Sequence, residues 1–381
     1  MKKRVCLVAA TPLTFHLFMK PHLNKLSEWA DVTILFNPNY HVGVQPVMVA
    51  GNVKHIEIAR KISIPHDLMS FIKIVLFFHR EKFDAVITLV PKAGLLGSVA
   101  GWLCGIKTRI HIFQGEVWFT KSGLTRTVLK TADKVIAFMS SHLLCVSDSQ
   151  CKFLFHQNIC KHEKLNILGH GSITGVDTQR FCPNTKFRSK IRENFGIPTN
   201  ACVILFVGRI VREKGLVELV EAFNHLRKTH EDLTLMLVGP DDEGLAKNLR
   251  KITKSENRDF LILCGLSNSP EKFMAAADIF CLPSHREGFG MAALEASSCA
   301  LPVIGTEIHG LSDAVINDKT GILVPVSNHL KLCNALAKLI QNPKLRKSYG
   351  NAGRKRVMKD FEHRKVIDNY SDFFRSVIEK N

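Results

Sequence analysis

The sequence lacks the features that mark membrane-spanning and disulfide-rich proteins. No run approaches the roughly 20 apolar residues that a membrane-spanning helix requires. The 11 cysteines form no C-x-x-C pair, and several lie within apolar runs. This spacing favours buried thiols in a reducing compartment over a disulfide framework or a zinc site. We interpret the short apolar run near the N-terminus as a first strand and not as a signal peptide, and we therefore expect a cytoplasmic chain.

Low-complexity tracts are also missing, and the 381 residues suffice for two domains of ordinary size, each with its own core. Strand and helix signals alternate along the chain, which predicts an α/β protein with parallel, doubly wound sheets. In the first half the expected strands are 4–9, 31–36, 53–58, 84–90, 108–113, 143–147 and 165–168. In the second half they are 201–207, 233–239, 260–264, 278–282, 301–306 and 322–324.

The net charge of +18 is concentrated in the first half of the chain. Residues 1–190 hold 25 Lys and Arg against 11 Asp and Glu, whereas residues 191–381 hold 27 against 23. A basic half attracts nucleic acid, anionic lipid head groups or phosphorylated substrates. Because the sequence contains no nucleic-acid recognition module, nucleic acid is not an expected partner. Residues 71–80 interleave cations with apolar and aromatic residues, a pattern that fits a peripheral membrane helix and a buried core helix equally well.

The densest set of candidate binding groups lies in residues 284–304. Glu287 and Glu295 are eight residues apart, and the glycines between them predict that Glu287 lies in a loop after a strand and Glu295 in the following helix. Carboxylates in this position could accept hydrogen bonds from sugar hydroxyls. Unpaired amides at the start of the helix would favour a phosphate. These amides belong to Gly288, Phe289, Gly290 and Met291. Taken alone, the spacing is explained equally well by an ordinary loop that enters a core helix.

A second candidate set follows the first strand of the second half, in the order G-R-x-x-x-x-K-G from Gly208 to Gly215. Apolar residues at helical spacing begin at the next position, so Arg209 and Lys214 are expected in a strand-to-helix loop. Arg presents a planar fork to phosphate oxygens and Lys a compact charge. Isolated cations in such a loop are more often simply solvated.

Four motifs occur in a fixed order: G-V-D-x-x-x-F-x-P at 175–183, G-R-x-x-x-x-K-G at 208–215, E-x7-E at 287–295 and G-I-L-V-P at 321–325. Together they resemble the family 4 retaining glycosyltransferases of GT-B fold, and in particular bacterial enzymes that build surface polysaccharides such as O-antigen and capsule. The resemblance implies two facing Rossmann-like domains with a cleft between them. Residues 1–183 would form the acceptor side, with the C-terminal helix 362–381 packing back on it, and residues 184–361 would bind the donor.

The resemblance also implies an activity and a role for each motif. A glycosyl group would move with retention of configuration from a nucleotide diphosphate sugar, most readily a UDP-sugar, to a lipid diphosphate-linked saccharide at the inner face of the membrane. Arg209, Lys214 and the glycine-turn amides would stabilise the leaving diphosphate. Glu287 would hold the donor sugar near its anomeric carbon, and Glu295 the ribose hydroxyls. Family members generally act without a bound metal, so neither metal nor cofactor is expected.

The acceptor half departs from the family pattern. Residues 11–16 contain no glycine, although many relatives have a Gly-rich turn there. Where relatives carry a His-Gly pair that contacts the transferred sugar, this chain has Gln114 followed by glycine. Gln114 is therefore a candidate contact for a sugar hydroxyl, while His111, inside the strand, is expected to be a core residue.

Two further residues are tentative acceptor contacts. Lys92 follows the fourth expected strand and could meet an acceptor diphosphate or be a solvated residue at a helix start. Glu116, together with Trp118, could shape the acceptor pocket. Two other functions stay open: another GT-B sugar-nucleotide enzyme, such as an epimerase or a phosphorylase, and a non-catalytic protein that binds a sugar nucleotide or a polyanion.

Overall fold

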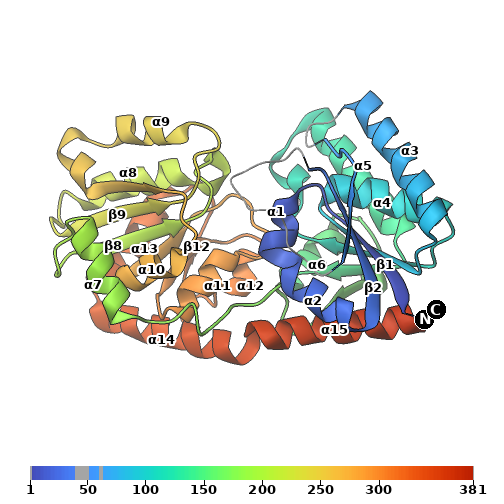
Figure 1. The fold of residues 1–381 in the computed structure, drawn as a ribbon. Helices are drawn as coiled ribbons and strands as arrows, with labels where there is room; N and C mark the ends of the chain where they lie inside the picture. The colour runs from blue at the N-terminus through green and yellow to red at the C-terminus, as the bar shows by residue number, and fades with distance from the viewer. Residues whose placement is uncertain (1, 39–50, 60–62, 381) are drawn as a thin grey trace. The chain divides into compact units, whose positions relative to one another are not determined.

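The computed structural model describes residues 2–38, 51–59 and 63–380 (Figure 1). The chain divides into two compact units, Met1–Gly175 with Arg364–Asn381, and Val176–His363. The two connecting segments pair where the division falls, because the amide of Val176 donates to the carbonyl of Phe361 at 2.8 Å and the amide of His363 donates to the carbonyl of Val176 at 3.0 Å. Residues 176–183, which the sequence analysis assigned to the first domain, therefore belong to the second unit.

The first unit is built on a seven-stranded sheet in the order β3-β2-β1-β4-β5-β6-β7. Every neighbouring pair is parallel, and β4 is buried along its whole length. A parallel sheet covered on both faces needs such continuous apolar strands. The strands are β1 Lys3–Val8, β2 Ala30–Phe36, β3 Asn52–His55, β4 Ala85–Leu89, β5 Thr108–Phe113, β6 His142–Cys145 and β7 Leu165–Ile167. Each overlaps a strand that the sequence pattern predicted.

Helices cover both faces of this sheet (Figure 1). They are α1 Pro12–Thr14, α2 Lys20–Trp29, α3 Ile64–Glu81, α4 Pro91–Leu103, α5 Gly123–Met139, α6 Asp148–His156 and α15 His363–Glu379, with a π-helical turn at Phe15–Met19 between α1 and α2. The C-terminal helix α15 buries an apolar face against the first unit. The hydroxyl of its Tyr370 donates to the carbonyl of Ser172 at 3.2 Å, and the Tyr370 ring lies edge-on to His22.

The second unit repeats the architecture with a six-stranded parallel sheet in the order β10-β9-β8-β11-β12-β13. Its strands are β8 Cys202–Val207, β9 Leu233–Val238, β10 Leu261–Gly265, β11 Ile279–Leu282, β12 Val303–Thr306 and β13 Gly321–Val324. Its helices are α7 Thr185–Asn194, α8 Leu216–Leu226, α9 Leu245–Ile252, α10 Pro270–Ala276, α11 Met291–Ser298, α12 Leu311–Ala314, α13 His329–Ile340 and α14 Pro343–Asp360.

In each sheet the strand order reverses beside the first strand, between β1 and β4 and between β8 and β11. Loops on the two sides of such a reversal lead to opposite faces of the sheet and leave a crevice at the carboxyl ends of the strands, where ligands of open α/β sheets bind. All eleven cysteines are free thiols. Within the described ranges, no helix is long and apolar enough to cross a membrane.

Candidate functional site

The loops that leave β8 and β11 bring two of the predicted motifs together. Lys214 ends a short 3-10 turn before α8, and its ammonium donates to Oε1 of Glu287 at 2.7 Å. The hydroxyl of Ser284 donates to the same carboxylate oxygen at 2.7 Å. Only 14% of the Lys214 side chain and 13% of the Glu287 side chain are exposed. The two residues are far apart in the sequence, but they meet at the reversal point of the sheet. The two predicted motifs therefore contribute to one common site.

Close backbone contacts hold these loops in register. Gly215 has a left-handed φ of +67°, and a Cβ there would collide with the carbonyl oxygen of Pro283. Gly310, with φ +84°, leaves no room for a side chain beside the carbonyl oxygen of Gly288. Both positions therefore require glycine, for conformation as well as for space. Gly208 directly follows β8, and its amide donates to the carbonyl of Val238 at 2.9 Å.

The turn before α11 has the form that the glycine spacing predicted. Glu287 lies in the loop, Glu295 lies inside α11, and Gly290 caps the helix in a left-handed conformation. The ring of Phe289 is buried and packs against Phe361 with 5.5 Å between centroids, which anchors the turn. In the part of the chain that the structure describes, no acceptor is found for the amides of Gly288, Phe289 and Gly290. These amides can therefore donate to an anion.

The carboxyl of Glu295 has a pKa above the ordinary value of a glutamic acid. Burial raises its pKa to about 7, and although the charge of Arg180 opposes this shift, the charge of Glu271 adds to it. At neutral pH the group is thus divided between the neutral and the ionised form. A neutral carboxyl both donates and accepts hydrogen bonds, whereas an ionised one only accepts.

Arg209 occupies the edge of the site and is held loosely. Its guanidinium lies 3.4 Å from Glu213 and 3.4 Å from Asp242, and 39% of its side chain is exposed. Glu213 also receives Arg286 at 3.0 Å. Burial alone would raise the pKa of Glu213, but Arg286, Lys214 and Arg209 together hold it below its ordinary value.

Sequence reasoning missed several of these partners. Ser284, Glu213 and Arg286 belong to the same charged network as the predicted clamp, and Glu218 of α8 accepts a hydrogen bond from His285 at 2.9 Å. This bond raises the pKa of His285 and lowers that of Glu218. The one available signal was that these polar residues directly adjoin the two motifs in the sequence.

The cations and carboxylates of the site are paired with each other in the described structure. A diphosphate that enters would compete with Glu287 for Lys214, and with Glu213 and Asp242 for Arg209. When the diphosphate replaces these carboxylates, the cations still have an anionic partner. A carboxylate then becomes free to accept hydrogen bonds from sugar hydroxyls. Across the described ranges, no group of three His, Cys, Asp or Glu side chains is arranged to hold a metal ion.

In the first unit, two tentative acceptor contacts remain open. The Nε2 amide of Gln114, just after β5, is buried and has no hydrogen-bond partner among the described residues. It is therefore a donor without an acceptor, which suits a sugar hydroxyl. Lys92, in the first turn of α4, donates to both carboxylate oxygens of Asp67 at 2.8 and 2.9 Å. It is not merely solvated, and an acceptor diphosphate would have to take it from Asp67.

The structure does not support a direct acceptor contact for Glu116 or Trp118. Glu116 is wholly buried and accepts a hydrogen bond from Gln150 at 2.9 Å. Trp118 is also buried, and its indole donates to Asp133 at 2.7 Å. The two side chains therefore form an interior polar cluster that is closed off from solvent. The reason is the 3-10 turn Val117–Thr120, which directs this segment into the core.

His111 is a core residue, as expected. It is buried within β5, and its Nδ1 lies 2.8 Å from the hydroxyl of Thr88. Burial lowers its pKa to about 3, so the imidazole is neutral at physiological pH.

Comparison with known proteins identifies relatives of both halves of the chain. Residues 187–356 match the family model described as glycosyl transferases group 1. The capsular polysaccharide biosynthesis glycosyltransferase CapM of Staphylococcus aureus is 29% identical over 332 residues, which cover 86% of this chain and 85% of that protein. An Escherichia coli UDP-Gal:alpha-D-GlcNAc-diphosphoundecaprenol alpha-1,3-galactosyltransferase is 26% identical over 326 residues, or 84% of this chain and 82% of that protein.

Solved structures share the fold over the whole chain. Sucrose-phosphate synthase from Thermosynechococcus elongatus superposes with a TM-score of 0.81 at 18% identity and covers 100% of both chains. The Anabaena protein Alr3699/HepE in complex with UDP and glucose gives a TM-score of 0.80 at 16% identity, and the match covers 99% of this chain and 100% of that one.

Proposed function

We propose that this chain, which belongs to the group 1 glycosyltransferases and has the GT-B fold, transfers a sugar from a UDP-sugar to a lipid diphosphate-linked saccharide with retention of anomeric configuration. The observation that carries the proposal is the contact between Lys214 and Glu287 at the reversal point of the second sheet. A cation for the diphosphate and a carboxylate for the sugar lie side by side there, as the directly bonded diphosphate and sugar of a nucleotide sugar require.

The chemical step needs stabilisation of the charge that develops on the leaving diphosphate. For retention, the acceptor hydroxyl approaches the anomeric carbon from the same face as the leaving diphosphate. The bond from that carbon to the diphosphate oxygen breaks, and the hydroxyl proton passes to the departing diphosphate. Lys214, Arg209 and the amides of the turn before α11 would bind the diphosphate oxygens. Donors fixed by the fold before the reaction stabilise such charge without reorganisation, which is the main electrostatic contribution to catalysis.

Once Lys214 turns to the diphosphate, Glu287 loses its ion-pair partner but keeps the hydrogen bond from Ser284. It would then accept hydrogen bonds from the hydroxyls of the donor sugar and hold the anomeric carbon in place. Glu295 would bind the ribose hydroxyls from inside α11. The proposed reaction uses no metal, because the cationic side chains and amides take the position that a metal ion would otherwise occupy beside the diphosphate.

The nature of the donor and acceptor rests on the relatives. The E. coli relative is named for a UDP-Gal donor and a diphosphoundecaprenol-linked acceptor, and the S. aureus relative for capsular polysaccharide biosynthesis. Both names fit an enzyme of surface polysaccharide assembly, an O-antigen or a capsule, that acts in the cytoplasm at the inner face of the membrane. We propose the same setting for this chain.

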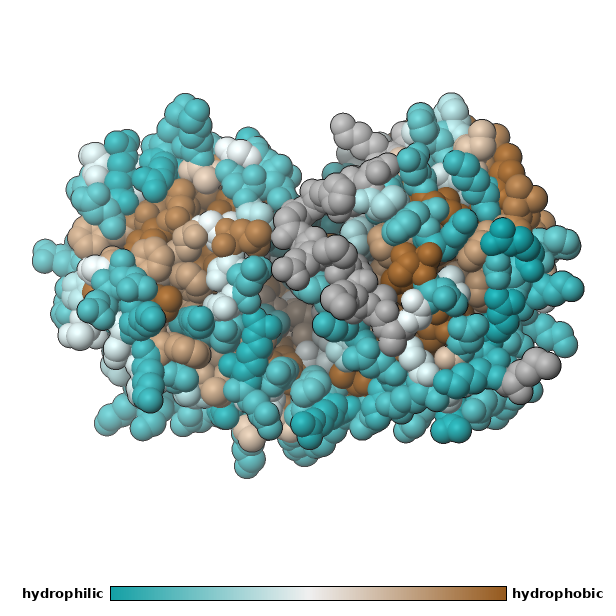
Figure 2. Space-filling view, in the orientation of Figure 1, coloured by the Kyte–Doolittle hydropathy of each residue, from teal (hydrophilic) through white to brown (hydrophobic). Residues whose placement is uncertain are grey.

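The surface of α3 supports contact with that membrane. The helix buries Ile74, Phe77 and Phe78 on its inner face, so these residues of the segment 71–80 belong to the core. Its outer face exposes large aliphatic side chains, and Figure 2 shows hydrophobic atoms over this helix at the upper right. The exposed residues are Ile64, Leu68, Met69, Ile72 and Leu76. With the basic charge of the first half, this face fits a helix that lies in an anionic interface.

The donor is tested by a thermal unfolding screen of the purified chain against UDP-, GDP- and dTDP-sugars in the presence of EDTA. We expect selective stabilisation by UDP-sugars that is lost in Lys214→Ala. Stabilisation by none of them, or only when a metal is added back, would contradict the proposed donor site. The membrane contact is tested separately by flotation with anionic vesicles at low salt, where Leu68→Asp with Leu76→Asp should reduce binding. Equal flotation of this variant and the wild type would contradict the role of α3.

A further inference from the structure

A cavity of about 400 Å³ lies in the second unit, at the edge of the sheet opposite to the donor loops. It is bordered by the segments that lead into the amino ends of β11 and β12, among them Asp278 and Pro302. Since β11 spans four residues, about 13 Å of strand separates this cavity from the donor loops. The volume lies in the range of small-molecule sites.

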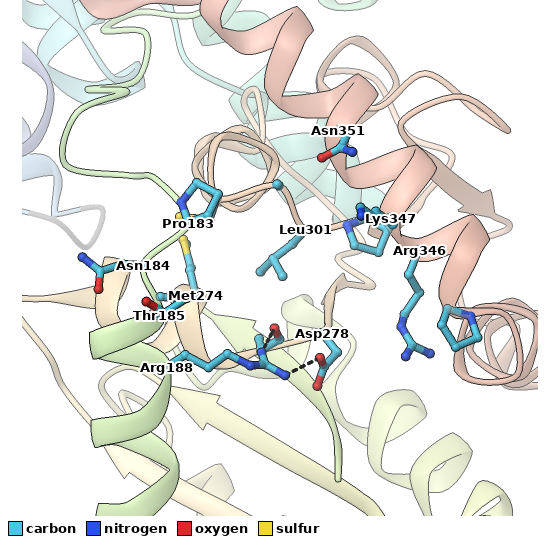
Figure 3. A pocket seen from close by; sticks show the side chains of 16 residues that line it. Pro183, Asn184, Thr185, Arg188, Met274, Asp278, Leu301, Arg346, Lys347 and Asn351 are labelled. Carbon is cyan, nitrogen blue, oxygen red and sulfur yellow. Dashed lines mark hydrogen bonds and ion pairs between the residues drawn. The ribbon is translucent and has the colours of Figure 1, made fainter. Parts of the chain in front are cut away.

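Cationic side chains from two helices surround the cavity. Figure 3 shows Arg188 extending from α7 toward Asp278, with Arg346, Lys347 and Asn351 on α14. Arg188 donates to Asp278 at 2.8 Å and to the carbonyls of residues 276 and 277. Asp278 receives a second guanidinium, that of Arg192 in α7, at 2.7 Å. The one carboxylate that lines the cavity is therefore already neutralised.

The two cations of α14 retain unused binding capacity. The Nη1 group of Arg346 donates to the carbonyls of Leu339 and Ile340 at 2.7 and 2.8 Å. For its Nε and Nη2 groups, the described residues offer no hydrogen-bond partner. Lys347 is exposed and has no ion pair or hydrogen bond to any residue that the structure describes. The cavity thus has an excess of positive charge that protein groups leave uncompensated.

The rest of the lining of the cavity mixes apolar side chains with polar ones, and Asn184, Thr185 and Asn351 are among the polar residues. Figure 3 shows Met274, Leu301 and Pro183 among the side chains that face it. Two helices begin at its border, α7 at Thr185 and α14 at Pro343, and their positive ends add to the field of the cations. A ligand that suits this surface has a phosphate group at one end and a carbon framework at the other.

We propose that this cavity binds the phosphate group of a small phosphorylated ligand, a phosphomonoester or an organic diphosphate, at a site distinct from the donor site. Lys347 and Arg346 contact the phosphate, and the apolar wall holds the organic part. The phosphate can come from a soluble metabolite or from a lipid head group, and both present the same chemistry to the cations.

The test uses the full chain and calorimetry with inorganic pyrophosphate, glucose 1-phosphate and vesicles that contain phosphatidic acid. All titrations are repeated in Lys214→Ala, which weakens the donor site's own attraction for phosphates. We expect pyrophosphate binding to persist in Lys214→Ala. Lys347→Glu should weaken it roughly tenfold or more, because a charge-assisted hydrogen bond is replaced by repulsion. Asn351→Trp, which fills the mouth of the cavity without a change of charge, should weaken it as well.

The matched control is Lys355→Glu, the same charge reversal on an exposed residue of α14 that does not line the cavity. It should leave pyrophosphate binding unchanged. Binding of glucose 1-phosphate points to a soluble ligand, and vesicle binding that Lys347→Glu alone abolishes points to a lipid head group; either result supports a phosphate site. The proposal is overturned if the wild type binds no pyrophosphate, if Lys214→Ala abolishes all binding, or if Lys347→Glu and Lys355→Glu behave alike. Loss of all binding in Lys214→Ala, or equal behaviour of Lys347→Glu and Lys355→Glu, would leave the proposed donor site standing. A wild type that binds no pyrophosphate would count against both sites, and the UDP-sugar screen then decides the donor site separately.

Discussion

Removal of the Lys214 side chain should have two effects that can be measured separately. Among the described residues, Lys214→Ala leaves Glu287 with the hydroxyl of Ser284 as its remaining donor. The loss of one partner from a fully buried ion pair costs about 3–5 kcal/mol of stability. Because about one-seventh of each side chain is exposed here, we expect a smaller loss, ~2 kcal/mol. The same change removes a charge-assisted contact to the diphosphate, worth ~1.5–3 kcal/mol, so that UDP should bind ~10- to 100-fold more weakly.

A double variant separates the two effects. Lys214→Met combined with Glu287→Gln replaces the pair by neutral side chains and leaves no unpaired charge. Its stability should return to within ~1 kcal/mol of the wild type. UDP affinity should stay low, because the cation that binds the diphosphate is still missing. The change at residue 287 should not alter UDP affinity, since UDP carries no donor sugar for that side chain to hold.

Urea unfolding measures the stability of each variant, and calorimetric titration measures its affinity for UDP. Lys92→Ala is a matched control, since Lys92 forms an ion pair of 2.8 Å with Asp67 at similar exposure, 18% and 20%, in the other unit. It should lower stability by a comparable amount and leave UDP affinity unchanged. If the double variant regained UDP affinity, the loss of UDP affinity in Lys214→Ala would come from the Glu287 carboxylate that has lost its cation. The assignment of Lys214 to the diphosphate would then be refuted.

Three further predictions concern the glycine contacts, the ionisation of Glu295 and the interior polar cluster. Gly215→Ala should abolish UDP binding and lower stability by about 2 kcal/mol more than Gly244→Ala. Gly244 has the same φ of +67° but open space around it, so equal losses of stability would mean that backbone conformation alone matters. Because the pKa of Glu295 is raised from 4.5 to about 7, its neutral form stabilises the fold at low pH and this stability is lost as pH rises through that window. Relative to Glu295→Gln, the wild type should therefore lose roughly 2 kcal/mol between pH 5 and pH 8 in urea unfolding, and parallel pH profiles would contradict the shift. Trp118→Phe removes the indole donor to a buried carboxyl and should cost about 2 kcal/mol, whereas the exposed Trp102→Phe should be nearly neutral; similar urea midpoints would argue against the cluster.

The parts of the fold that sequence predicted well are those with a strong local pattern. Strands buried on both faces are visible in the sequence as continuous apolar runs, and the observed strand β5, Thr108–Phe113, has the predicted bounds. The glycines before α11 likewise predict that Glu287 lies in a loop and Glu295 in a helix, since the left-handed backbone at Gly290 ends the loop and begins the helix.

The parts that sequence could not predict depend on packing between distant segments. Nothing in the residues around Glu116 indicates that its carboxylate is buried beside Gln150, because the chain must first turn into the core at residues 117–120. The pairing of Glu213 with Arg286 is equally remote in sequence. The division between the two compact units lies at Val176, before the expected boundary at 184, and Val176 hydrogen-bonds there to the distant segment at 361–363.

The most direct test of the proposed activity is the stereochemistry of the product. The purified chain, in EDTA, is incubated with an α-linked UDP-sugar and a short-chain lipid diphosphate-linked saccharide, and the new glycosidic bond is examined by proton NMR. We predict a product with the α configuration, formed by the wild type and absent with Lys214→Ala. A β-linked product, or release of free sugar and UDP without transfer, would contradict the proposal that this site is a retaining glycosyltransferase centre for that acceptor.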